Sequence, residues 1–103
     1  MIKLSVLYPH VEGCHFDMQY YCDEHMPMVQ KILGNACKGV AVEEGLTGIE
    51  AGSPPSYLAM GHLYFDSLEV CRASFGANAS IFMDDVPNYT DIKPVIQLSE
   101  VKV

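Results

Sequence analysis

The sequence of 103 residues is poor in basic side chains and has no long apolar run. Lys and Arg together number 6, against 13 Asp and Glu, which gives a formal net charge of −7. Because proteins that bind nucleic acid or anionic membranes concentrate positive charge, neither partner is expected. A membrane helix needs roughly 18–20 consecutive apolar residues, and no segment approaches that length. The acidic excess therefore indicates solubility rather than a particular partner.

The start of the chain also lacks the features of a secretory leader, namely a long apolar segment and a small-residue cleavage site. Residues 1–6 instead have the composition of a strand. We therefore expect a cytoplasmic protein. Disulfides persist only in oxidising compartments, so the four cysteines are expected to be reduced thiols in or near the core. They are Cys14, Cys22, Cys37 and Cys71.

The length fits one domain, residues 1–103, but the composition is apolar for a domain of this size. Half of the residues are hydrophobic. A domain of about 100 residues buries only roughly 60–70% of the surface of its unfolded chain. Such a chain is too apolar to be disordered. Apolar surface left over after folding predicts a partner subunit.

The polarity pattern predicts the element order β-α-β-β-α-β. A stripe of apolar residues at helical spacing predicts a first helix over residues 16–33. A second helix starts at the capping-box pair Asp66 and Glu69, Gly76 ends its first section, and a short helical piece follows at 79–83. Runs of strand-forming residues predict four strands, at residues 2–8, 37–44, 57–65 and 93–102.

This order is the split βαβ pattern of a ferredoxin-like α+β fold, a four-stranded antiparallel sheet with helices on one face. The other face of such a sheet is open, and a second copy of the sheet could cover it. Pro27 predicts a kink or a restart in the first helix, because proline lacks an N–H and its ring clashes with the carbonyl of Asp23. The loop over 45–56 is longer than usual, and such loops are either functional or mobile.

His25 is the strongest candidate for a functional residue. It lies on the apolar stripe of the first helix, with Tyr21 one turn earlier on the same stripe. An inward-facing histidine beside a second polar group can serve as a general acid or base, or can orient a substrate. Alternatively, His25 is a histidine at the edge of the core, bonded to a carbonyl or a tyrosine hydroxyl. Spacing leaves both interpretations open.

His62 and Tyr64 are a second candidate pair, since they project from one face of the strand at 57–65. If this face lines a cavity, they provide two polar groups in an apolar wall, the usual composition of a small-molecule pocket. Alternatively, they lie in an interface between two sheets. Alternation along a strand does not tell which face meets the helices.

A metal site and a cysteine nucleophile are weaker candidates. The residue types of H-x3-C-x7-C-x2-H suit tetrahedral zinc, but this spacing matches no common structural zinc pattern. Cys22 lies three residues before His25, so both side chains could face the same side of the helix, as a nucleophile and its base require. No glycine pattern of a phosphate or dinucleotide site occurs and no other cofactor motif is visible, so no cofactor is expected. No metal is expected either, because the spacing is unlike that of known zinc sites. The metal candidates are His10, Cys14, Cys22 and His25, and the acidic residues expected at the solvated surface are Glu43, Glu44, Asp84, Asp85 and Asp91.

Several blocks of the sequence form a recognisable pattern, namely FDMQYY (16–21), HMPMV (25–29), GHLYFDSLE (61–69), PNYTDI (87–92), Pro94 and QLSEV (97–101). In these blocks the sequence resembles the EthD family, which is named after a small protein of the ethyl tert-butyl ether degradation system. The resemblance implies a dimeric α+β barrel, in which two ferredoxin-like sheets pack face to face and each subunit holds a cavity between helices and sheet. It implies a role for His25, and with it for Tyr21 and Tyr89.

Relatives in this superfamily include small cyclases, muconolactone isomerases, cofactor-free monooxygenases and haem-degrading enzymes. The absence of tryptophan weakens the analogy with the haem-degrading enzymes. Cys14 and Cys22 depart from the usual pattern of the family.

The sequence and the resemblance together lead us to expect a homodimer that acts on or binds a small, largely apolar organic molecule in a degradation pathway. In the first hypothesis, His25 and Tyr21 catalyse a cofactor-free isomerisation, cyclisation or proton transfer. In the second, the protein is a non-catalytic carrier or a partner of an oxygenase, and in the third it binds haem or a metal. The isologous dimer interface is expected to exceed about 1,200 Å² of buried surface. The expected pocket-lining residues are Met28, His62, Tyr64 and Tyr89.

Overall fold

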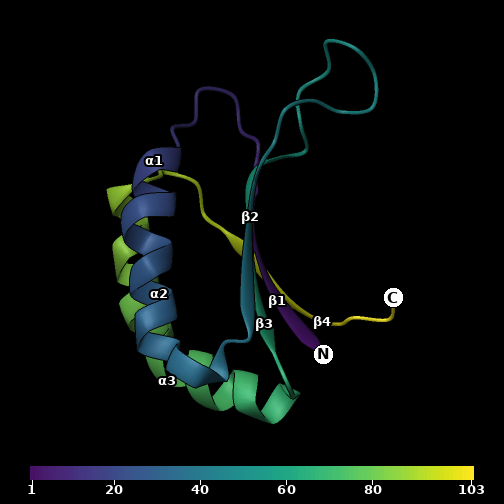
Figure 1. Ribbon diagram of the computed structural model, residues 1–103. Helices are drawn as coiled ribbons and strands as arrows, with labels where there is room; N and C mark the ends of the chain where they lie inside the picture. Colours follow the sequence, from purple (N-terminus) through teal and green to yellow (C-terminus); the bar gives the residue numbers. More distant parts are fainter.

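The computed structural model describes residues 1–103 as one antiparallel sheet with two long helical segments against one of its faces (Figure 1). The strand order is β2-β3-β1-β4, and every neighbouring pair is antiparallel. This is the ferredoxin-like α+β fold, so the predicted element order is confirmed. The strands are β1 (Ile2–Pro9), β2 (Gly39–Glu44), β3 (Tyr57–Phe65) and β4 (Val95–Glu100).

The first helical segment changes its winding halfway along. After a short α1 (Met18–Tyr20), one π-helical stretch, η1 (Tyr21–His25), leads into α2 (Met26–Leu33). The wide turn is closed by the Met26 N–H, which donates to the carbonyl of Tyr21. The irregularity predicted from Pro27 is confirmed, because α2 restarts with this proline in its first turn. It takes the form of a widened turn rather than a break.

The second helix, α3 (Leu68–Asp85), is continuous, so the prediction that Gly76 ends its first section is wrong. Gly76 is exposed, and one glycine inside a helix costs only about 1 kcal/mol. Phe75 and Phe82 on the same helix are buried against each other, with ring centroids 5.2 Å apart, and this packing outweighs the glycine. The helix is capped by Ser67, whose hydroxyl accepts the N–H of Val70, and not by Asp66.

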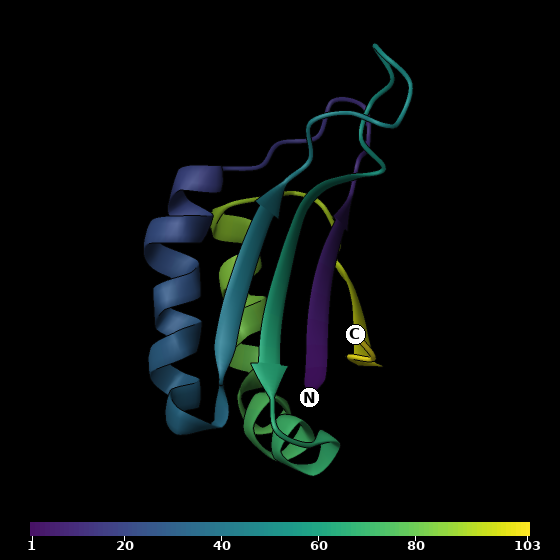
Figure 2. The ribbon, with the colours of Figure 1, turned by 45° about the vertical axis from the view of Figure 1, so that its right-hand side comes forward.

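The two faces of the sheet differ in their surroundings. Leu4 and Tyr8 of β1, with Leu63 and Phe65 of β3, are buried beneath the helices. The outer face has no helix over it, as Figure 2 shows. Two 3-10 turns, η2 (Gly34–Ala36) and η3 (Val86–Asn88), complete the helical layer.

The ends of the elements differ slightly from the sequence prediction. The last strand covers only Val95–Glu100 of the predicted 93–102, because it begins directly after Pro94, which cannot donate to a neighbouring strand. The loop over 45–56 extends past the end of the sheet (Figure 2), and its side chains Leu46 and Ile49 are exposed. None of the helices combines the length and apolar character that crossing a membrane requires.

Candidate functional site

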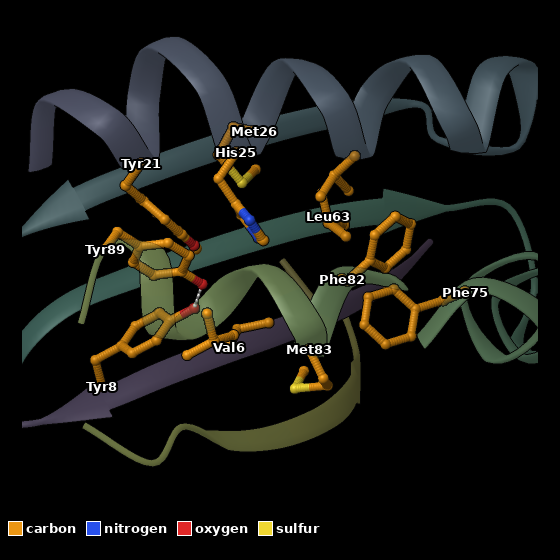
Figure 3. Close-up of a pocket in the computed structure, with 13 residues that line it drawn as sticks. Val6, Tyr8, Tyr21, His25, Met26, Leu63, Phe75, Phe82, Met83 and Tyr89 are labelled. Carbon is orange, nitrogen blue, oxygen red and sulfur yellow. Dashed lines mark hydrogen bonds between the residues drawn. The ribbon is translucent and has the colours of Figure 1, made fainter. Parts of the chain in front are cut away.

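A mostly apolar cavity lies between the helical layer and the sheet (Figure 3). Its empty volume is about 350 Å³ when the open solvent at its mouth is included, and 11 of its 13 lining residues are hydrophobic. The enclosed part is narrow and holds about one water molecule, so a larger ligand requires side chains such as Met26 and Met83 to move. The lining residues are Val6, Tyr8, Tyr21, His25, Met26, Val29, Gly61, Leu63, Phe75, Phe82, Met83, Val86 and Tyr89.

The π-helical stretch η1 supplies the two polar residues that the sequence places first, Tyr21 and His25. Both are buried, and their rings stack with centroids 5.4 Å apart and an interplanar angle of 13°. Such stretches often occur at functional sites, because one extra residue in the turn re-aims the side chains. Here the widened turn directs both rings toward the sheet (Figure 3).

Asp85, at the end of α3, holds the His25 imidazole in place. His25 Nδ1 lies 2.8 Å from Asp85 Oδ2. The other carboxylate oxygen accepts hydrogen bonds from the Tyr20 hydroxyl and the Asn88 amide, each at 2.8 Å. Since an ionised carboxylate only accepts hydrogen bonds, Nδ1 carries the imidazole proton. His25 Nε2 therefore keeps a free lone pair, which is what a general base requires.

The pKa values of this pair favour a neutral histidine beside an ionised aspartate. Burial lowers the pKa of His25 below its ordinary 6.5, and the hydrogen bond and charge of Asp85 offset this only in part. Burial by itself would raise the pKa of Asp85. The hydrogen bonds from Asn88, His25 and Tyr20 outweigh that effect and hold the pKa below its ordinary value. At neutral pH the pair is thus ready to accept a proton on Nε2.

This arrangement has a consequence for stability. Because the pKa of His25 is lower in the folded state, the unfolded chain binds more protons once the pH falls toward 6.5 and below. The free energy of unfolding is therefore expected to fall on acidification, and Asp85 adds to the loss at still lower pH as it protonates. Urea unfolding of the wild type and of His25→Gln at pH 7.5 and 5.5 measures this. The pH dependence should be smaller in the variant, and an equal dependence would contradict the assignment.

Two further hydroxyls meet in the wall of the cavity. Tyr8 Oη of β1 lies 2.6 Å from Tyr89 Oη, which follows η3 (Figure 3). Tyr21 completes the group, and its hydroxyl packs against Gly61, at a point where a Cβ atom would collide with it. Burial raises the pKa of all three phenols. They remain protonated, so they are hydrogen-bond donors at any pH near neutral.

The structure brings three of the sequence-predicted site residues together, namely Tyr21, His25 and Tyr89. The residues Tyr8 and Asp85 were not predicted, and Asp85 was expected at the solvated surface. A signal for both exists in the periodicity, because Tyr8 shares the inward face of its strand with Leu4 and Val6. Asp85 lies three residues after the buried Phe82, on the stripe of α3 that faces the core.

The remaining predicted residues lie elsewhere. His62 and Tyr64 project from the outer face of the sheet, away from the cavity, since their neighbours Gly61 and Leu63 face the helices. His62 Nδ1 lies 2.8 Å from Ser5 Oγ, and Nε2 lies 3.0 Å from Glu43 Oε1. Met28 is half-buried on α2 and is not among the lining residues. The loop 45–56 contributes no lining residue either.

The metal candidates are not assembled. No group of three or more His, Cys, Asp or Glu side chains is placed to hold an ion, so His10, Cys14, Cys22 and His25 form no such site. Cys22 is exposed while His25 is buried, and the partner of His25 is a carboxylate rather than a thiol.

Comparisons with known proteins agree with the fold. A family model described as the EthD domain matches residues 16–93. The structure is similar to that of an EthD-like protein from Ralstonia eutropha, with 48% identity, a TM-score of 0.94, and coverage of 99% of this chain and 92% of that chain. None of the curated proteins matches the chain.

Two more distant solved structures share the fold. An ethyl tert-butyl ether degradation (EthD) family protein from Bacillus halodurans has 19% identity and a TM-score of 0.68, with 99% of each chain covered. A candidate antibiotic biosynthesis monooxygenase from Bordetella bronchiseptica has 13% identity and a TM-score of 0.62, over 99% of this chain and 97% of that chain.

Proposed function

The chain belongs to the EthD family, and from that premise we propose that it binds a small, largely apolar organic molecule in its cavity and transfers a proton on it. The observation that carries the proposal is the His25–Asp85 pair at 2.8 Å, with the free Nε2 of His25 in a cavity of apolar walls. Apolar walls of this kind bind the body of an organic ligand, while a few polar groups orient it.

In this proposal His25 is the acid and base, and Asp85 is a positioning residue. Nε2 removes a proton from the ligand, and the Asp85 carboxylate stabilises the imidazolium that forms. The imidazolium then returns the proton to the same atom or to another one. Proton transfer, isomerisation and cyclisation are reactions that such a pair can catalyse, because they exchange only protons and rearrange bonds within the ligand.

A non-catalytic carrier is the second candidate, favoured by the 11 hydrophobic residues among the 13 that line the cavity. The experiment that separates the two is an NMR screen of small apolar compounds in D₂O with the wild-type protein. An enzyme both binds a compound and exchanges its hydrogen for deuterium. Its rate should rise with pH through an apparent pKa below 6.5, because the base must be neutral. Binding with no exchange of any bound compound would favour the carrier.

We further propose that two copies pair through the outer face of the sheet. This face surrounds the polar Ser5–His62–Glu43 group with apolar side chains and has no helix over it. Pairing would remove that apolar surface from water and bury the polar group, whose members already bond to one another. The apolar side chains are Leu7, Leu58, Met60, Tyr64 and Val95.

Light scattering at micromolar concentration tests the dimer. The wild type is expected at twice the mass of the chain. A charge on this face, in Met60→Glu, should give a monomer, because the new carboxylate lies opposite Glu43 and is left unpaired, and an unpaired buried charge costs several kcal/mol. Ala77→Glu, on the exposed side of α3, is the matched control and should leave the dimer intact. A monomeric wild type would end the proposal. A cytoplasmic location and a place in a degradation pathway are also part of the proposed function.

A further inference from the structure

We propose that the ligand of the cavity is an enolisable carbonyl compound, whose carbonyl oxygen binds to the hydroxyl pair of Tyr8 and Tyr89. This inference rests on the proposed function of His25 and names the substrate class of the same site. Three observations carry it: an unused proton on the hydroxyl pair, the composition of the cavity wall, and the position of the pair relative to His25.

The hydroxyl pair holds one more proton than its mutual hydrogen bond uses. Tyr8 and Tyr89 have two phenolic protons, and their contact at 2.6 Å uses one of them. Apart from the neighbouring Tyr21 hydroxyl beside Tyr8, neither hydroxyl has another side-chain partner within the chain. If the adjacent Tyr21 hydroxyl joins the group, one proton is still unused, because three hydroxyls have three protons and form two mutual hydrogen bonds. One O–H is therefore left to donate in a place that is almost fully buried, and buried donors are as a rule satisfied.

The wall of the cavity selects a neutral acceptor for that proton. No lysine or arginine lines it, so a carboxylate or phosphate ligand would enter without a countercharge. A carboxylate or a phosphate shares its charge among two or more oxygens, and the one spare hydroxyl proton can meet only one of them, so part of the charge would be buried unpaired, which disfavours such anions. A carbonyl oxygen is a neutral acceptor, and the apolar side chains Leu63, Phe75 and Phe82 are suited to the rest of a small organic molecule.

The hydroxyl pair and the histidine act on the same space. The rings of Tyr89 and His25 are in contact, with centroids 4.7 Å apart, and both point into the cavity (Figure 3). A carbonyl oxygen held by the hydroxyls therefore places the neighbouring carbon near the imidazole. This is the combination that proton abstraction next to a carbonyl requires, a base on one side and a hydrogen-bond donor at the oxygen that becomes negative.

The step is balanced without a further reactant. The C–H bond next to the carbonyl breaks, its proton passes to His25 Nε2, and its electron pair forms a carbon–carbon double bond. The π pair of the carbonyl moves to the oxygen, where the hydroxyl pair donates to it. Hydrogen bonds to a charged oxygen are stronger than those to a neutral one, so the pair stabilises the enolate more than the ketone. The imidazolium then returns the proton to carbon.

4-Nitrophenol is a suitable probe, because its phenolate oxygen resembles that of an enolate and its ionisation changes its absorbance. 4-Nitrotoluene, of similar shape but without the hydroxyl, is the control ligand. The wild-type protein should bind both and should lower the apparent pKa of 4-nitrophenol. Tyr8→Phe together with Tyr89→Phe should weaken 4-nitrophenolate binding by about 10–100-fold and leave 4-nitrotoluene within about twofold.

The outcomes separate the inference from the function on which it rests. If both ligands bind with equal affinity and 4-nitrophenol keeps its solution pKa, the hydroxyl pair has no such role, although the cavity binds small molecules. If neither ligand binds, the inference fails together with the proposed function. The wild-type spectrum needs no variant, so the test holds even if the double variant does not fold.

Discussion

Replacing Asp85 with asparagine is expected to slow proton transfer by about 10²–10⁴-fold, the full contribution of a general base. An asparagine amide can donate to His25 Nδ1, which favours the tautomer with its proton on Nε2. The lone pair of the imidazole would then be on Nδ1, which faces residue 85 and not the cavity. No carboxylate would stabilise the imidazolium. His25→Gln lacks the base altogether, so its rate is the minimum with which the rate of Asp85→Asn should be compared.

The neighbouring residue offers a matched control for this experiment. Asp84 is exposed and makes no side-chain hydrogen bond, so Asp84→Asn makes the same change of charge one residue away. Deuterium exchange of a bound compound gives the rate, and NMR titration gives the pKa of His25. The pKa of His25 should be lower in Asp85→Asn than in the wild type, because the Asp85 carboxylate of the wild type raises it. It should stay unchanged in Asp84→Asn. An undiminished rate in Asp85→Asn would remove Asp85 from the mechanism.

Replacing Gly61 with alanine is expected to destabilise the protein by about 1–3 kcal/mol and to displace Tyr21 from the cavity wall. The new methyl group would lie so close to the Tyr21 hydroxyl oxygen that the two would collide. Neither the Tyr21 ring nor the backbone at Gly61 can move away easily. Tyr21 is 1% exposed, and Gly61 lies on a central strand, paired with Val6 on one side and Val42 on the other. Urea unfolding measures the loss.

A second substitution shows whether that collision is the cause. Tyr21→Phe removes the oxygen, and the nearest remaining atom of the ring is then Cζ, 3.3 Å from the methyl position. The double variant should therefore lose less stability than the sum of the two single variants, as contacting residues do. Gly76→Ala is the control, because no neighbouring atom lies within 4 Å, and it should gain up to about 1 kcal/mol. Strictly additive losses would contradict the collision.

The fold was predictable because each of its elements has a local signal. Alternation of polarity located the strands, and the element order then selected the ferredoxin-like arrangement. The misplaced end at Gly76 has a tertiary cause, since the sequence gives the cost of a helical glycine but not the packing of Phe75 on Phe82. The outward position of His62 depends on which face of the sheet meets the helices, and alternation alone is symmetric in the two faces.

The site was predictable only where its residues are close in sequence. His25 and Tyr21 belong to one turn of one helix, so their spacing indicated a shared face. Their partners come from far along the chain, Asp85 at a separation of 60 residues and Tyr8 from the first strand. Only the packing of α3 beside the first helical segment brings the carboxylate to the imidazole. The π-helical winding of η1 has no signal in the apolar pattern, which fits a regular helix equally well.

That widened turn gives a criterion for comparing this protein with its relatives. One extra residue in a regular α-helix would rotate everything before it by about 100° relative to everything after it. The wider π-helical turn absorbs one residue, so the segments on its two sides keep their faces toward the sheet. A relative with one residue fewer between the capping Asp17 and Pro27 would therefore wind as a plain α-helix and keep the same faces. Its alignment with this chain would contain a single gap, and a tyrosine and a histidine on the two sides of that gap would still share the cavity face. A gap in this segment is therefore no reason to exclude a relative from a proposed activity.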